Sequence, residues 1–131
     1  MSGAPLNALS LAPQLTCGDI QKSITFYVDG LGFEIIHKME REGKLEYVAL
    51  KGGGAQLGLG QDDFKKGKDR VKGTGVRVWI TTDQDIVALA GHATAAGLTL
   101  DDGPVKQEWG PMSFSLTDPD GFKVSVSGPW A

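Results

Sequence analysis

Cysteine, excess positive charge and long apolar runs are what this sequence has least of. Cys17 is the single cysteine among 131 residues, so no disulfide can form within the chain, which is typical of a reducing cytoplasm. No apolar run comes near the roughly 20 residues that a membrane-spanning helix needs. The start of the chain lacks a basic segment followed by a continuous apolar stretch, so we expect no signal peptide. Together these absences predict a cytoplasmic protein.

The charge balance argues against nucleic acid as a partner. The formal net charge is −3, whereas proteins that bind nucleic acid through its phosphates carry an excess of basic residues. The one basic cluster, between Lys65 and Lys72, is interleaved with aspartates and glycines, which is typical of a solvated loop. A phosphate contact is the alternative for this cluster. The apolar content of 40% and the length both suit one globular domain.

Hydrophobic periodicity predicts the same order of elements twice. The elements expected in the first unit are a strand, a helix and three strands, at residues 8–16, 20–29, 33–40, 45–51 and 55–60. The second unit repeats this order at residues 75–82, 83–97, 98–100, 112–117 and 122–126, its helix starting at Asp83 or Asp85 and residues 101–106 forming a loop. Internal duplication at this period is the main organisational signal.

The duplication predicts an α+β fold of two tandem βαβββ modules that form a curved mixed sheet with helices on the convex face. All 131 residues would make one domain, with module one at about 8–60, a linker at 61–73 and module two at about 74–128. The concave face of such a sheet is a natural pocket.

Two motifs, one in each module, carry a resemblance to a known family. The first is the run of Asp19, Ser23, Phe26, Tyr27, Leu31, Gly32 and Phe33. The second is Trp109-Gly110 followed by the turn Asp118-Pro119-Asp120-Gly121. By these motifs the chain resembles the vicinal oxygen chelate superfamily, also called the glyoxalase, bleomycin-resistance and extradiol dioxygenase group. One such fold hosts many chemistries, so the resemblance implies the fold more strongly than an activity.

The resemblance also implies four positions for ligands of a divalent metal, and the residues there are poor donors. Enzymes of this superfamily use His, Glu or Gln at these positions. In this chain the positions fall on Ala12, on Gln56 or Gly58, between Val76 and Val78, and on Ser125. At most Gln56 could donate, so we expect no metal and no other cofactor. The closest match is therefore the metal-free, bleomycin-resistance-like branch.

Alternation along the strands indicates which side chains face the cavity. If Leu15 and Cys17 face the helix, Gln14 faces the cavity, and in the fifth strand Arg77 and Trp79 do so. The predicted ligand-binding residues are Gln14, His37, Tyr47, Arg77, Trp79, Trp109 and Ser125. For both tryptophans the alternative is core packing or a dimer interface, and for His37 it is a partly buried histidine held by a neighbour. Cys17 is expected to be buried and structural, and His92 to face solvent.

These residues favour a binding protein over an enzyme, and we predict no catalytic residue. The predicted function is metal-independent binding or sequestration of a small aromatic compound, as in antibiotic resistance, because aromatic rings stack and Arg77 can pair with an acidic group. A homodimer is implied by the resemblance. The alternative is a metal-dependent lyase, isomerase or dioxygenase with displaced ligands such as Gln56, His37 or Glu46. A third hypothesis is a non-enzymatic partner of another protein, docked at a sheet edge.

Overall fold

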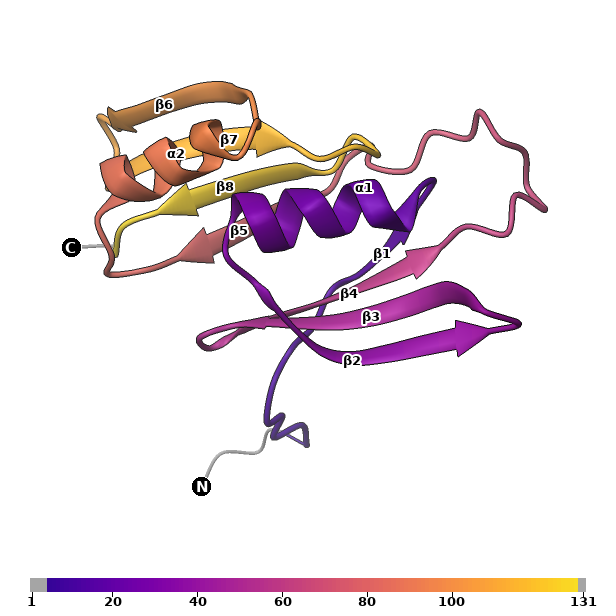
Figure 1. Cartoon of the computed structure of the whole chain (residues 1–131). Helices are drawn as coiled ribbons and strands as arrows, with labels where there is room; N and C mark the ends of the chain where they lie inside the picture. The colour runs from indigo at the N-terminus through magenta and orange to yellow at the C-terminus, as the bar shows by residue number, and fades with distance from the viewer. Residues whose placement is uncertain (1–4, 130–131) are drawn as a thin grey trace.

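The structure, a computed structural model, describes residues 5–129 and contains two βαβββ units in succession (Figure 1). The first unit comprises β1 (Gln14–Cys17), α1 (Ile20–Ile24), the π-helical turn η1 (Thr25–Gly30), β2 (Glu34–Arg41), β3 (Lys44–Gly52) and β4 (Ala55–Gln61). The second unit comprises β5 (Arg77–Thr81), α2 (Ile86–Ala95), β6 (Leu100–Lys106), β7 (Met112–Thr117) and β8 (Lys123–Ser127). Across residues 5–129, the helices are all too short or too polar to cross a bilayer.

Each unit builds one four-stranded mixed sheet with the same topology. Sheet A has the order β1-β4-β3-β2 and sheet B has the order β5-β8-β7-β6. The first strand of each unit runs parallel to the fourth, and the other pairs are antiparallel. The α+β fold class and the two tandem modules are confirmed. In the part of the chain that is described, no strand of sheet A pairs with a strand of sheet B, so the predicted curved sheet is present as two sheets.

The two sheets share one hydrophobic core that contains the helices. Figure 1 shows α1 between the strands of sheet A and those of sheet B. Buried side chains from both sheets and from η1 and α2 belong to a single cluster, among them Leu15, Val48, Leu59, Tyr27, Ala93, Phe114 and Val124. Each sheet therefore has an inner face that packs on the helix layer and an outer face that points away from it. We use these two names below.

The turn of module two, Asp118 to Gly121, is bonded to the first strand and helical segment of module one. The hydroxyl of Tyr27 donates to Asp118 Oδ2 at 2.7 Å. Asp118 Oδ1 accepts from the backbone N–H groups of Asp120 and Phe122, at 2.9 Å each. Asp120 Oδ1 accepts from Gly18 N at 2.8 Å. Burial raises the pKa of both Tyr27 and Asp118 above the usual values. We call these five residues the module junction.

Each of the two α-helices begins after an aspartate that caps it. Asp19 accepts from the N–H groups of Gln21 and Lys22 at the start of α1, and Asp85, the second of the two predicted starts, accepts from Ala88 N at the start of α2. Such side-chain acceptors satisfy N–H groups that have no partner within the helix. The first helix differs from the prediction in its second half, which is the wider π-helical turn η1.

Two strand predictions are wrong in extent. The first strand begins at Gln14 rather than at residue 8. Pro13, just before it, has no backbone N–H to donate to a neighbouring strand. Residues 101–106, predicted as loop, belong to β6. This edge strand pairs with β7 alone and contains two register shifts, which accommodate glycine and proline. In β2 the register shifts between Ile35 and His37. Ile35 pairs with the buried Leu50, whereas His37 pairs with Ala49 and lies on the outer face.

Candidate functional site

The outer face of sheet B carries an arginine bonded to a row of serines. Phe114 of β7 is buried on the inner face of sheet B. Its neighbours Ser113 and Ser115 therefore lie on the outer face, because successive side chains on a strand alternate. Arg77 Nη1 donates to Ser125 Oγ at 2.7 Å. Ser125 Oγ lies 3.2 Å from Ser115 Oγ, close enough for a second hydrogen bond. The face therefore offers an arginine held by the hydroxyl of Ser125. Lys123, the strand partner of Arg77, is a second cationic side chain on this face.

Two tryptophans form an aromatic surface on the same face. Trp79 is the strand partner of Ser125, and Trp109 reaches it from the loop between β6 and β7. Their ring centroids lie 5.9 Å apart with planes tilted by 49°, within the range of contacting aromatic pairs. The indoles are 38% and 57% exposed, respectively. Because the rings already touch, a flat ligand could stack on their exposed surfaces but not between them.

The outer face of sheet A carries the other predicted residues. Tyr47 Oη donates to Gln14 Oε1 at 2.8 Å. The pair lies over Gly58, where a Cβ would overlap both side chains and require them to move. His37 is exposed on the neighbouring strand and pairs with Ala49, which shares a face with Tyr47. This second group is polar, and Tyr47 is its one phenol ring beside the imidazole of His37.

The structure thus divides the seven predicted ligand-binding residues between two sheets. Gln14, His37 and Tyr47 lie on the outer face of sheet A. The other members, Arg77, Trp79, Trp109 and Ser125, lie on sheet B or against it. The helix layer separates the two outer faces, so one copy of the chain does not bring the two groups together.

The four positions that would hold a metal in related enzymes do not fit one here. Ser125 accepts a hydrogen bond from Arg77, so a guanidinium lies where a divalent cation would be repelled. Val78 packs against the core, and Ala12 has no donor atom. Among residues 5–129, there is no group of three or more His, Cys, Asp and Glu side chains arranged to hold a metal ion. Gln56, at the remaining position, is a single amide donor, too few by itself for a metal site.

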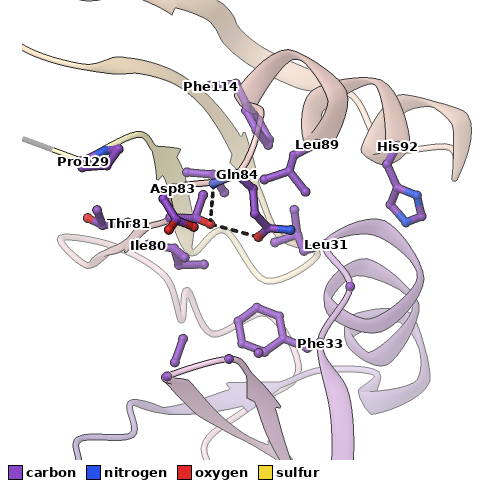
Figure 2. A pocket seen from close by; sticks show the side chains of 17 residues that line it. Leu31, Phe33, Ile80, Thr81, Asp83, Gln84, Leu89, His92, Phe114 and Pro129 are labelled. Atoms are coloured by element: carbon purple, nitrogen blue, oxygen red, sulfur yellow. Dashed lines mark hydrogen bonds between the residues drawn. The ribbon is translucent and has the colours of Figure 1, made fainter.

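A cavity between the two modules was not predicted from the sequence. It has a volume of about 920 Å³, and Figure 2 shows it open between Phe33 of module one and the loop that follows β5. Its apolar wall includes Leu31, Phe33, Ile80, Leu89, Phe114 and Val126. These residues have the alternation expected of core positions, so no sequence signal distinguishes a cavity wall from a filled core. None of the seven predicted site residues lines it.

Two members of the linker's basic cluster, Arg70 and Lys72, pair with the buried carboxylate of Asp62. Asp62 Oδ2 lies 3.2 Å from Arg70 Nη2 and 3.5 Å from Lys72 Nζ. Desolvation acts to raise the pKa of Asp62, but the N–H of Phe64 and the two cations outweigh it and hold that pKa below 3.8. A smaller cavity of about 410 Å³ adjoins this ion pair. Arg70 and Lys72 therefore have a structural role.

Cys17 and His92 lie where they were expected. Cys17 is 1% exposed, and burial raises the pKa of its thiol to about 11. His92 is exposed on α2, and its Nε2 lies 2.9 Å from the carbonyl oxygen of Asp29. Neither residue has the surroundings of a nucleophile or of a metal ligand.

The fold, the junction motifs and the sheet order together define the class of protein. The model of the Glyoxalase/Bleomycin resistance protein/Dioxygenase superfamily matches residues 9–126, and the chain belongs to that family. No curated protein sequence gives a significant match.

Solved structures of similar fold come from several bacteria. An integron cassette protein from V. cholerae is 28% identical, with 94% of this chain and 98% of that one covered and a TM-score of 0.67. A protein from the mobile metagenome of V. pseudocholerae is 26% identical, with 98% of each chain covered and a TM-score of 0.70. TnmS3, an antibiotic binding protein from Streptomyces sp. CB03234, is 24% identical, with 95% and 99% covered and a TM-score of 0.66.

Proposed function

We propose that this protein binds and sequesters a small aromatic compound on the outer face of sheet B, without a metal. The observation that carries the proposal is the pair of partly exposed indoles beside an arginine that is fixed by Ser125. Stacking on such a surface contributes about 0.5–1.5 kcal/mol beyond the burial of area. Arg77 supplies a cation for an acidic group on the ligand. TnmS3, which shares the fold, is an antibiotic binding protein, and this supports an antibiotic-like ligand.

We further propose that the protein acts in the cytoplasm as a homodimer. Two copies could place the outer face of sheet A from one chain opposite the outer face of sheet B from the other. The binding surface on sheet B would then gain Gln14, His37 and Tyr47, which one chain keeps apart from the tryptophans. Exposed apolar side chains support a covered surface, and Met39 lies on the outer face of sheet A beside Tyr47. Equilibrium sedimentation should give twice the chain mass, and Met39→Glu should lower it.

Tryptophan fluorescence tests the proposed ligand site. A panel of aromatic antibiotics should contain compounds that quench the protein saturably, with the same dissociation constant before and after treatment with a chelator. In the double variant Trp79→Phe and Trp109→Phe, Trp130 is the remaining tryptophan and serves as the internal control for non-specific quenching. Saturable binding detected calorimetrically should weaken in this variant. If no compound quenches, or if the double variant binds as tightly as the wild type, the proposed site is wrong.

Arg77→Gln tests the role of the charge. The variant should bind an acidic aromatic ligand about tenfold more weakly, which corresponds to about 1.4 kcal/mol. Binding of the matched neutral amide should change little, because the amide has no charge for Arg77 to pair with. Equal losses for the acid and the amide would show that Arg77 only supports the sheet.

A further inference from the structure

The cavity between the modules has the size and lining of a ligand site separate from the tryptophan surface. Its volume of about 920 Å³ lies within the usual range for small-molecule sites. Module one contributes Phe33 and the turn that follows β3, and module two contributes Ile80, Leu89 and Phe114. A molecule bound here would contact both modules at once. Its binding free energy would therefore add to the stability of the whole chain.

The rim of this cavity is polar at the loop between β5 and α2. Thr82 Oγ1 donates to Gln84 Oε1 at 2.9 Å and accepts from Gln84 N at 3.2 Å, so this loop is held by its own hydrogen bonds. Figure 2 shows both bonds beside Asp83. Across the cavity, His92 Nε2 donates to the carbonyl of Asp29, if the ring is neutral, and leaves Nδ1 as an acceptor.

The charges at the rim have one sign. Asp83 is the one Asp or Glu among the described residues that line the cavity, and no Lys or Arg lines it there. Hydrogen-bond acceptors and a carboxylate above an apolar wall suit a ligand with a donor or a positive charge at one end. An anionic end would meet the Asp83 carboxylate without a compensating cation.

From this arrangement we propose that the cavity between the modules binds a lipophilic amine. The apolar body of the ligand lies against Phe33, Ile80 and Phe114, and its protonated amino group pairs with Asp83. The site is distinct from the surface formed by Trp79 and Trp109, and the two can be occupied at the same time.

A matched series of ligands tests the charge preference. Decylamine, decanol and decanoate share one apolar chain, and isothermal calorimetry should rank their affinities in that order. Asp83→Asn should lower the affinity for decylamine about three- to fivefold, the scale of a solvent-accessible ion pair, and leave decanol unchanged. Asp83 is exposed in its loop, so the substitution should not impair folding. Equal affinities of decanoate and decylamine would overturn the proposal.

A matched pair of glycine substitutions tests the location. Gly54 lines the cavity, its backbone is outside the left-handed region, and a Cβ there meets no atom within 4 Å. Gly54→Phe should therefore fold and occupy the cavity, weakening decylamine binding at least about tenfold. Gly91 is equally open but lies outside the cavity, so Gly91→Phe should bind like the wild type.

Two further outcomes would contradict the proposal. Decylamine binding that is unchanged in Gly54→Phe but lost in the double tryptophan variant would assign the amine to sheet B. If no ligand of the series binds and Gly54→Phe halves the sedimenting mass, a second copy of the chain occupies the cavity instead.

Discussion

The hydroxyl of Tyr27 reaches across to Asp118, 91 positions later in the chain, and joins the helix of one module to the turn of the other. Both side chains are buried, Tyr27 completely. Tyr27→Phe should therefore lower the free energy of unfolding by about 1–3 kcal/mol, because Asp118 Oδ2 keeps its desolvation cost and loses its donor. Urea unfolding measures this change. Tyr47→Phe, at a partly exposed hydrogen bond, is the control and should cost less. Equal losses in the two variants would contradict the structural role of the junction.

Gly73 and Gly91 should respond in opposite ways to the same substitution. A Cβ at Gly73 would overlap the backbone of Gly121 and Phe122, so Gly73→Ala should destabilise the protein by about 1–3 kcal/mol or more. Gly91 lies within α2 in open space, and Gly91→Ala should stabilise by up to about 1 kcal/mol. Thermal unfolding of the two variants side by side tests the contact between the linker and the turn of module two. A stable Gly73→Ala protein would show that this contact is not formed.

Cys17 should resist thiol reagents in the folded protein. Burial disfavours the thiolate and raises the pKa from 9.0 to about 11, so the thiolate fraction at pH 8 falls about a hundredfold. The side chain is also shielded from the reagent. Reaction with iodoacetamide at pH 8 should be slower than in urea by more than this factor and should accelerate as the pH approaches 11. Rapid labelling in the folded state would indicate that the first strand opens.

The ion pair at Asp62 should make stability depend on acidity. Its pKa in the folded state lies below 3.8, so its contribution is fully present above about pH 4 and is lost as the pH falls through that lower value. Asp62→Asn should lower the urea midpoint at pH 7, and the gap from the wild type should narrow below pH 4. Asp63→Asn is the control, because its pair with Lys65 is exposed, and it should change the midpoint little. If the difference in urea midpoint between Asp62→Asn and the wild type stays constant down to pH 3, Asp62 does not form the ion pair with Arg70 and Lys72.

Local sequence signals determined most of the fold. The helix start at Asp85, the alternation along β5 and the spacing of the two motifs were enough to predict two βαβββ modules. Residues 101–106 were missed because aspartate, glycine and proline have low strand propensity, and β7 overrides that preference by pairing with them. The register shift after Ile35 was also missed, because alternation assumes a regular strand.

The candidate site was only partly predictable. Alternation placed Arg77 and Trp79 away from the core, and the pairing of β5 with β8 brings both beside Ser125. The contact of Trp79 with Trp109 depends on the loop between β6 and β7 instead. The same pattern says which face a residue lies on but not how two sheets stack. The separation of Tyr47 from Trp79 could therefore not be foreseen. The cavity beside Phe33 was hidden because cavity walls and filled cores have the same composition.

The module junction affects which substitutions the chain can tolerate during evolution. The residues that hold the two halves together point inward, toward the helices, whereas the proposed binding residues point outward. Substitutions of these outward-pointing residues can therefore alter which molecule is bound without weakening the contact between the modules. Because the two modules contact each other through their inner faces, the outer face of each can change under selection independently of the other.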